Sequence, residues 1–202
     1  MSAIKNIVFD FGAVLVDWNP HYVFDPYFGS KDRADWFISN ICTPEWNGEV
    51  DKGKPIVQAT AERIALYPEW EKEIRLYFDR WIDMVGDAIP GMLELVCQLK
   101  SRGYKLYGLS NWARETFNLV SDRFPVFKEL DGYIISGDVK MLKPESAIYQ
   151  ELIKKFDLEP SASIFIDDNP HNVKGSIDAG LPAIIFTDCS TLKKDLQELG
   201  IM

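Results

Sequence analysis

The stretch Ile7-Val8-Phe9-Asp10-Phe11-Gly12-Ala13-Val14 decides the fold of this chain. Its apolar residues form a short run, which is typical of a strand that is buried on both faces of a parallel sheet. The run is interrupted by Asp10, which we expect just beyond the carboxyl end of that strand. Ligands and reacting groups collect at this edge of open α/β sheets. Asp10 is therefore either a nucleophile and metal ligand or a residue that only caps the following turn.

The composition is typical of a soluble globular protein. The chain has 202 residues, of which 47% are hydrophobic and 26% charged, and this size suits one domain or one core with a small added lobe. The formal net charge of −9 argues against nucleic acid and anionic membranes as partners. Cys42, Cys97 and Cys189 form no CxxC pair, and the first residues lack a signal-peptide pattern, so we expect reduced thiols and a cytoplasmic location. No segment is long and apolar enough to span a bilayer, and no pattern indicates an oligomeric state.

Residues 17–88 differ in pattern from the rest of the chain. They are rich in Trp, Tyr, Phe and charged residues at helical spacing, with breaks at prolines and glycines. This pattern predicts four or five short helices and no strand, and the clearest helices are expected over 56–65 and 70–81. We expect the aromatic side chains to pack a small helical lobe on itself, although an aromatic ligand-binding box is the alternative.

From about residue 89 the pattern alternates between strands and helices. We expect strands over 104–109, 132–135, 163–166 and 183–186, and helices over 90–102, 113–124, 144–156, 170–179 and 192–199. This alternation predicts an α/β fold with a parallel sheet and right-handed crossovers. Residues 1–16 and 89–202 would form the core, and residues 17–88 would form a cap over the crevice at its edge.

Acidic side chains follow two of the predicted strands. Asp10 follows the first strand, and Asp167 and Asp168 follow the strand over 163–166. Two carboxylates about 4 Å apart repel each other by roughly 4 kcal/mol at an effective dielectric constant near 20. A group of three therefore requires a cation, and Mg²⁺ is the ion that oxygen ligands of this kind suit best. The alternative is that the pair only caps the next helix, although one acid would be enough for that.

Two further polar elements are expected at the same edge. Ser110-Asn111 lies between a strand and a helix, where a hydroxyl, an amide and free backbone N–H groups can bind an anion or simply cap the helix. Lys143 precedes Pro144, where we expect the helix over 144–156 to begin. A cation at that place opposes the helix dipole unless an anion binds beside it. A solvated surface lysine is the alternative.

Together these groups predict phosphoryl transfer. A carboxylate nucleophile, a divalent metal, an anion clamp and a lysine can position a phosphoryl group and neutralise its charge. Asp10 would attack phosphorus in line and form an aspartyl-phosphate, which water would then hydrolyse. The expected partner is thus a small phosphorylated substrate.

The order Asp-Phe-Gly-x-Val-Leu, Leu-Ser-Asn, Lys-Pro-Glu and Ile-Asp-Asp-Asn resembles the haloacid dehalogenase-like (HAD) hydrolase superfamily over essentially the whole chain. The nearest likeness is to a bacterial subgroup that includes an α-D-glucose-1-phosphate phosphatase. The resemblance implies a Rossmann-like three-layer core with an inserted all-helical cap. For the site it implies the following roles: Asp10 as nucleophile and Mg²⁺ ligand, the carbonyl of Gly12 and the carboxylate of Asp168 as further ligands with Asp167 in support, Ser110 and Asn111 holding the phosphoryl group, and Lys143 balancing charge.

Gly12 departs from the pattern of most phosphatases in this superfamily, which place a second Asp there as general acid and base. Glycine cannot transfer a proton, and such a group contributes about 10²–10⁴-fold to the rate. Either the enzyme prefers leaving groups of low pKa, such as an anomeric sugar hydroxyl, or another group substitutes. The candidates nearest in sequence are Asp17, His21 and His171.

Other functions stay open. A 2-haloacid dehalogenase would use Asp10 without a metal, but in that branch the fourth motif resembles Ser-Ser-Asn, where this chain has Asp167-Asp168-Asn169. A phosphonate-cleaving enzyme would need a Schiff-base lysine in the cap, for which Lys52 and Lys54 are available. A non-catalytic phosphate-binding relative is a third alternative. Trp112 either touches the leaving group or packs in the core.

Overall fold

A five-stranded parallel sheet forms the centre of the molecule. The structure, a computed structural model, describes residues 3–202. The strands lie in the order β5-β4-β1-β6-β7, with these bounds: β1 (Asn6–Phe9), β4 (Lys105–Ser110), β5 (Gly132–Ile135), β6 (Ser163–Asp167) and β7 (Ala183–Ile185). The middle strand is β1, in which Ile7 pairs with Leu106 on one side and with Ile164 on the other. The predicted buried first strand is therefore the axis of the sheet.

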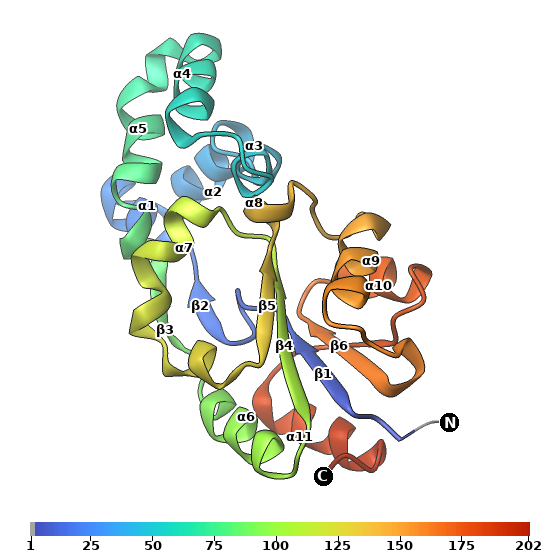
Figure 1. The fold of residues 1–202 in the computed structure, drawn as a ribbon. Coiled ribbons are helices and arrows are strands. Elements are labelled where there is room, and N and C mark those ends of the chain that lie inside the picture. The colour runs from blue at the N-terminus through green and yellow to red at the C-terminus, as the bar shows by residue number, and fades with distance from the viewer. Residues whose placement is uncertain (1–2) are drawn as a thin grey trace.

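Helices cover both faces of this sheet (Figure 1). One face packs against α6 (Met92–Ser101), α7 (Arg114–Val120) and α11 (Cys189–Glu198), and the other against α9 (Ser146–Lys155) and α10 (Pro170–Asp178), while the short α8 (Ser136–Val139) follows β5. The side chains of β1 alternate between the two cores, because Ile7 and Phe9 join one hydrophobic cluster and Val8 joins the other. The predicted three-layer α/β fold is confirmed.

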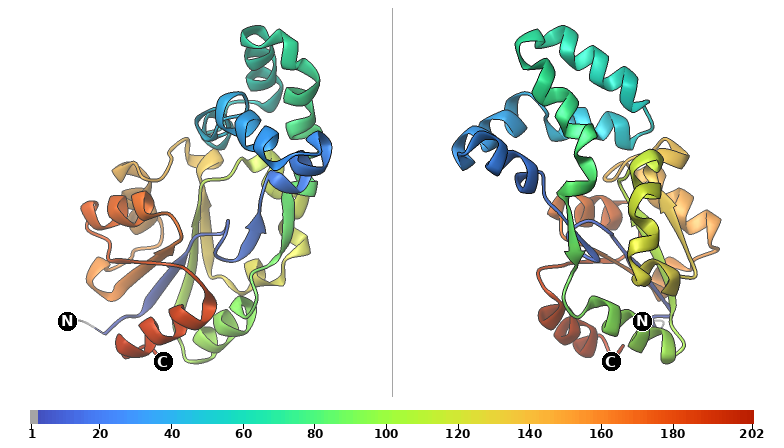
Figure 2. Two further views of the ribbon diagram at one scale, coloured as in Figure 1. Left: turned by 180° about the vertical axis from the view of Figure 1, so that it is seen from behind. Right: turned by 90° about the vertical axis from the view of Figure 1, so that its left-hand side faces the viewer.

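Residues 21–79 contain five helices, which we call the helical lobe. Their bounds are α1 (His21–Phe28), α2 (Lys31–Asn40), α3 (Pro44–Asp51), α4 (Ile56–Leu66) and α5 (Glu71–Asp79). The lobe stands over the end of the sheet at which β4 and β5 run into α7 and α8, and both views of Figure 2 show it apart from the sheet. Its aromatic residues pack on one another, as in the pair of Phe24 and Phe37 with ring centroids 4.8 Å apart. The aromatic side chains therefore pack the lobe on itself.

The prediction that residues 17–88 contain no strand was wrong. The two segments that connect the lobe to the sheet, β2 (Val16–Trp18) and β3 (Val85–Ala88), pair with each other in an antiparallel ribbon. Both strands are too short to show alternation, and Gly86 and Asp87 disfavour strands. Only the pairing of two distant segments makes them strands, and no local pattern reports such pairing.

The helix expected from Pro144 begins at Ser146 instead. The N–H of Glu145 donates to the carbonyl of Leu142 (2.8 Å), so the segment before the helix forms a turn. In this turn the backbone N–H and C=O of Lys143 are both hydrogen-bonded to the side chain of Asn111. These bonds hold Lys143 against the end of β4 and outside the helix. None of the helices within residues 3–202 is long and apolar enough to cross a membrane.

Candidate active site

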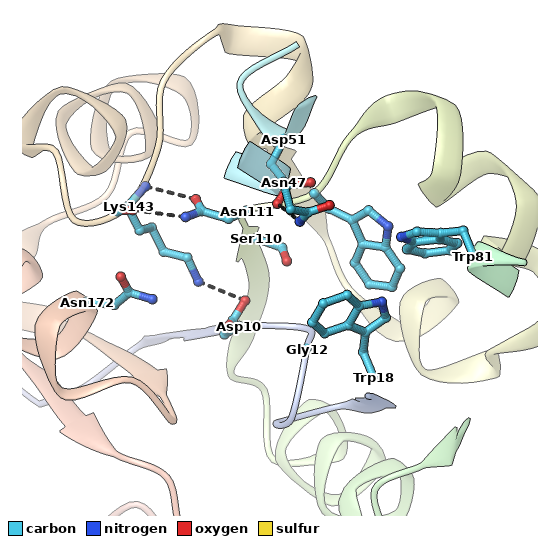
Figure 3. Close-up of a pocket in the computed structure, with 11 residues that line it drawn as sticks. Asp10, Gly12, Trp18, Asn47, Asp51, Trp81, Ser110, Asn111, Lys143 and Asn172 are labelled. Atoms are coloured by element: carbon cyan, nitrogen blue, oxygen red, sulfur yellow. Dashed lines mark hydrogen bonds and ion pairs between the residues drawn. The ribbon is translucent and has the colours of Figure 1, made fainter. Parts of the chain in front are cut away.

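A cavity of about 110 Å³ lies between the carboxyl ends of β1 and β4 and the helical lobe (Figure 3). Core segments and the lobe both contribute to its surface. The residues that line it are Asp10, Gly12, Trp18, Asn47, Asp51, Trp81, Ser110, Asn111, Trp112, Lys143 and Asn172. Five of the predicted site residues are therefore brought to one cavity, and Asp167 and Asp168 lie beside it, next to Asp10.

The carboxylate of Asp10 is held through one of its two oxygens. Oδ1 accepts hydrogen bonds from the backbone N–H of Phe11 (2.7 Å) and pairs with the ammonium of Lys143 (2.8 Å). No hydrogen bond to Oδ2 is found within residues 3–202, and the side chain is almost fully buried. A carboxylate fixed in this way presents a free oxygen to a group in the cavity, which is the geometry that a nucleophile requires.

The ammonium of Lys143 lies between two carboxylates. Its Nζ is 2.8 Å from Oδ1 of Asp10 and 2.6 Å from Oδ2 of Asp167, and only 1% of its side chain is exposed. Burial alone would lower the pKa of Lys143, but the attraction of Asp10 and Asp167 is stronger and raises it. The lysine is therefore charged, and carboxylates of the chain itself balance its charge, where the sequence suggested a bound anion.

Asp167 is fully buried and saturated with hydrogen bonds. Besides Lys143, it accepts two bonds from Nδ2 of Asn172 (both 3.1 Å) and one from the backbone N–H of Asn169 (2.8 Å). Both of its oxygens are thus occupied, so its position suits the support of Lys143 better than direct contact with a ligand. Asn172 belongs to the run Asp-Asp-Asn-x-x-Asn, but sequence reasoning assigned it no role.

Three acids cluster around this one ammonium. One carboxylate oxygen from each of Asp10, Asp167 and Asp168 lies within 4.8 Å of the others. Burial raises the pKa of Asp10 to about 7 against the opposing effect of Lys143, and burial together with Asp167 raises the pKa of Asp168. Three carboxylates against one ammonium leave surplus negative charge at this place. Oxygen ligands with surplus negative charge fit a hard divalent cation such as Mg²⁺.

The predicted anion clamp divides into two parts. Ser110 lines the cavity, and within residues 3–202 its hydroxyl makes no hydrogen bond to another group, so it can bind a ligand. The side chain of Asn111, in contrast, accepts from the N–H of Lys143 (2.8 Å) and donates to its C=O (2.9 Å). Asn111 therefore positions the lysine and keeps one amide hydrogen free.

The helical lobe contributes two polar residues that sequence reasoning missed. The helix α3 begins with the side chain of Thr43 accepting from the N–H of Trp46. Asn47 and Asp51 follow four residues apart on one face of this helix, and Nδ2 of Asn47 donates to Oδ2 of Asp51 (2.8 Å). The spacing is their only sequence signal, and it occurs in many helices without any site.

Asp51 is also a contact between the lobe and the core. Its Oδ1 accepts from the backbone N–H of Ala113 (3.1 Å), and its own carbonyl accepts from the hydroxyl of Ser136 (2.6 Å). Burial raises the pKa of Asp51 to about 7, and the hydrogen bond from Ala113 opposes the shift. A carboxyl group that gains or loses its proton near neutral pH therefore lines the cavity.

Indole rings form the apolar wall. Trp81 from the 3₁₀ turn Trp81–Met84 packs on Trp112 with ring centroids 5.7 Å apart, and Trp18 from β2 lies beside them. Trp112 also packs edge-on against Phe117 in the core (5.5 Å). Trp112 thus packs in the core and also lines the cavity.

The three residues considered as substitutes for an acid at position 12 are absent from the cavity lining. Asp17 accepts from the hydroxyl of Tyr22 on another part of the surface. His21 contacts Asp25 and Asp35 within the lobe, and His171 is exposed at the start of α10. None of these positions brings its side chain to a ligand near Asp10.

The two lysines considered for Schiff-base chemistry also lie outside the lining. Lys52 pairs with Glu145 (2.6 Å), and Lys54 pairs with Glu49 (2.6 Å) and Glu62 (2.7 Å). All these acidic partners are about half exposed, so the pairs are surface ion pairs.

Several known phosphatases and hydrolases are similar to this chain in sequence. Flavin mononucleotide hydrolase 1 of Arabidopsis thaliana is 31% identical over 113 residues, which are 56% of this chain and 46% of the relative, so the match spans about half of that protein. The D-ribitol-5-phosphate phosphatase of Bacteroides thetaiotaomicron is 25% identical over 84% of this chain and 85% of its own length. The sesquiterpene phosphatase astK of Aspergillus oryzae is 24% identical over 98% and 97%, respectively.

Solved structures show the same fold. A HAD family enzyme of Bacteroides thetaiotaomicron, in complex with magnesium and inorganic phosphate, superimposes with a TM-score of 0.72 at 21% identity, over 94% of this chain and 99% of that one. The model of the haloacid dehalogenase-like hydrolase family matches residues 4–180, which include every predicted site residue. The chain therefore belongs to the haloacid dehalogenase-like hydrolase family.

Proposed function

We propose that this protein is a Mg²⁺-dependent phosphatase that hydrolyses a small phosphate monoester through an aspartyl-phosphate on Asp10. The observation that carries the proposal is the cluster of three carboxylates, with oxygens within 4.8 Å, around the single ammonium of Lys143. The names of the relatives, a flavin mononucleotide hydrolase and a D-ribitol-5-phosphate phosphatase, support it. A dehalogenase would not need the surplus negative charge that Asp167 and Asp168 place beside Asp10.

Each residue has a part in this reaction. Lys143 and the N–H of Phe11 hold Oδ1 of Asp10, so Oδ2 attacks phosphorus in line with the leaving oxygen. The hydroxyl of Ser110 donates to an oxygen of the phosphoryl group. Water then attacks phosphorus, the bond to Oδ2 breaks, and inorganic phosphate leaves.

Asp10, Asp168 and the carbonyl of Gly12 would hold the Mg²⁺, with Asp167 in support. The ion would neutralise the charge of the phosphoryl oxygens. Gly12 suits this place because it lies in the cavity lining beside Asp10. The fit to a divalent ion rests on the carboxylate cluster itself, where three acids face one ammonium.

Residues 17–88 would act as a cap over the core of residues 1–16 and 89–202. This cap contributes Asn47, Asp51 and Trp81 to the cavity, so it would contact the leaving group. A volume of about 110 Å³ and flat indole walls favour a compact leaving group, and a sugar phosphate is the substrate class that we propose.

The test is the hydrolysis of para-nitrophenyl phosphate with Mg²⁺ and with a chelator. Asp10→Asn should lower kcat/KM by about 10⁴-fold or more, as loss of a nucleophile does. The exposed acid Asp122 offers a matched control, and Asp122→Asn should leave the rate unchanged. Turnover that persists in Asp10→Asn contradicts the proposal, and so does turnover that is equally fast with Mg²⁺ and with the chelator. A panel of sugar phosphates would then identify the substrate class.

A further inference from the structure

Gly12 is not required by the backbone. Its φ lies outside the left-handed region, and a side-chain carbon built on it would meet no atom within 4 Å. The backbone therefore has room for the first carbon of a side chain at position 12. Since neither strain nor space demands a glycine there, the missing acid calls for a chemical explanation.

Only three residues of the cavity lining carry titratable side chains: Asp10, Lys143 and Asp51. Asp10 and Lys143 pair with each other, and the proposed function uses both. Asp51 has no such use, and no lysine or arginine in the described part of the chain forms an ion pair with it. In Figure 3 it reaches the cavity from the lobe, with Ser110 between it and Asp10.

We propose that Asp51, a residue of the helical lobe, performs the proton transfer that Gly12 cannot perform. The inference rests on the proposed function and deepens it. Two hydrogen bonds, from Ala113 (3.1 Å) and from Asn47 (2.8 Å), fix the orientation of its carboxyl group. The bond from the hydroxyl of Ser136 to the backbone carbonyl of Asp51 (2.6 Å) fixes the end of α3 against the core. The acid therefore has a defined place in the part of the cavity wall that the helical lobe supplies.

Bonds and protons balance in both steps of the reaction. As Oδ2 of Asp10 bonds to phosphorus, the bond to the leaving oxygen breaks, and the proton of Asp51 passes to that oxygen, which leaves as an alcohol. The resulting carboxylate of Asp51 then takes a proton from the attacking water as phosphorus separates from Asp10. Burial raises the pKa of Asp51 to about 7, so both protonation states are accessible near neutral pH.

The alternative is that Asp51 only joins the lobe to the core. Asp51→Asn separates the two roles, because an amide oxygen can still accept from Ala113 but an amide cannot transfer a proton. If Asp51 only joined the lobe to the core, the loss of activity in Asp51→Asn would be the same for every leaving group. A proton donor would matter most when the leaving oxygen is strongly basic.

The experiment measures kcat/KM for para-nitrophenyl, phenyl and propyl phosphate, in order of increasing basicity of the leaving oxygen. We expect Asp51→Asn to remain within a few-fold of wild type on the first substrate and to lose about 10²–10⁴-fold on propyl phosphate. Glu49→Gln is the matched control, because it removes one acid from the same helix outside the cavity. Adding Gly12→Asp to Asp51→Asn should restore part of the activity on propyl phosphate.

An equal loss on all three substrates, or no loss on any of them, overturns the inference. If Asp51→Asn fails to fold, as judged by its melting curve, Asp51→Ser replaces it, since a hydroxyl keeps a hydrogen-bond acceptor. The same substrates tested with Asp10→Asn keep the two proposals separate. If wild type has no Asp10-dependent activity, the proposed function fails, whereas Asp10-dependent activity with a flat response in Asp51→Asn rejects the inference alone.

Discussion

The floor and the wall of the cavity differ in origin and in how their charges are paired. The floor comes from the strand ends, where Lys143 joins Asp10 and Asp167 at 2.8 and 2.6 Å. The wall comes in part from the helical lobe, which brings in Asp51 without a cationic partner in the described chain, and in part from Trp81 in the turn after the lobe. The difference suggests that the sheet fixes the groups that act on phosphorus, while the inserted helices supply those that meet the leaving group. Substitutions in the floor, in the wall and at the rim between the lobe and the core test this division.

The largest effect is expected in the floor. Lys143→Met leaves Asp10 and Asp167 buried beside each other without their cation, which should cost about 3–5 kcal/mol of unfolding free energy at pH 7 and abolish turnover. Denaturant unfolding of the variant and of wild type measures this loss of unfolding free energy. Equal stability of the two proteins would mean that the buried pair contributes nothing, and the floor would not differ from a surface ion pair.

Removal of one acid from the metal cluster should act on metal affinity. Asp168 is exposed and within 4.8 Å of the other two carboxylates, so Asp168→Asn should preserve folding and raise the Mg²⁺ concentration for half-maximal activity roughly 10–100-fold. Titration of activity with Mg²⁺ provides the measurement, with Asp178→Asn as an exposed control. An unchanged Mg²⁺ requirement would place the ion elsewhere.

In the wall, Asp51 should reduce stability as the pH rises. Its pKa is raised in the folded state, so its favourable contribution is complete below about pH 4 and is lost as the pH rises to about 7. Asp51→Asn should therefore gain about 2–3 kcal/mol of unfolding free energy relative to wild type between pH 5 and pH 8. Burial, with smaller effects of Cys42 and Asp51, raises the pKa of Tyr77, and the pair of Asp10 and Lys143 shares the cavity with Asp51. A constant difference between variant and wild type across this range contradicts the prediction.

The smallest effect is expected at the rim between the lobe and the core. The pair of Lys52 and Glu145 is about half exposed, so Lys52→Ala should change the unfolding free energy by less than about 1 kcal/mol. Activity on aryl phosphates should stay within about twofold of wild type. Complete loss of activity would contradict this prediction and would mean that the contact between Lys52 and Glu145 is needed to hold the lobe on the core.

The sequence predicted the floor well because its groups follow buried strands. The apolar run before Asp10 and the one before Asp167 identify strands, and a parallel sheet brings the ends of its strands to one edge. Its errors were local. Short strands such as β2 and β3 depend on a partner far along the chain, and the start of α9 depends on bonds from Asn111 to Lys143.

The wall could not be predicted in the same way. Asp51 reaches the cavity because α3 is docked on α8 and on the loop before α7, and no pattern within residues 17–88 encodes that docking. Asp17 and His171 are close to the motifs in sequence but lie outside the cavity lining, whereas Asp51, which lines the cavity, lies 39 positions after Gly12. In the structure, Asp51 is distinguished by a buried carboxyl group that has no cationic partner in the described chain.

The central claim is that Asp10 carries the phosphoryl group. The most direct test mixes enzyme, Mg²⁺ and substrate, quenches the reaction with acid within one turnover, and measures the masses of the proteolytic peptides. We expect a peptide containing Asp10 that carries one phosphoryl group, and we expect this peptide to be absent in Asp10→Asn. Release of phosphate with the group on another residue, or with full turnover in Asp10→Asn, would contradict it.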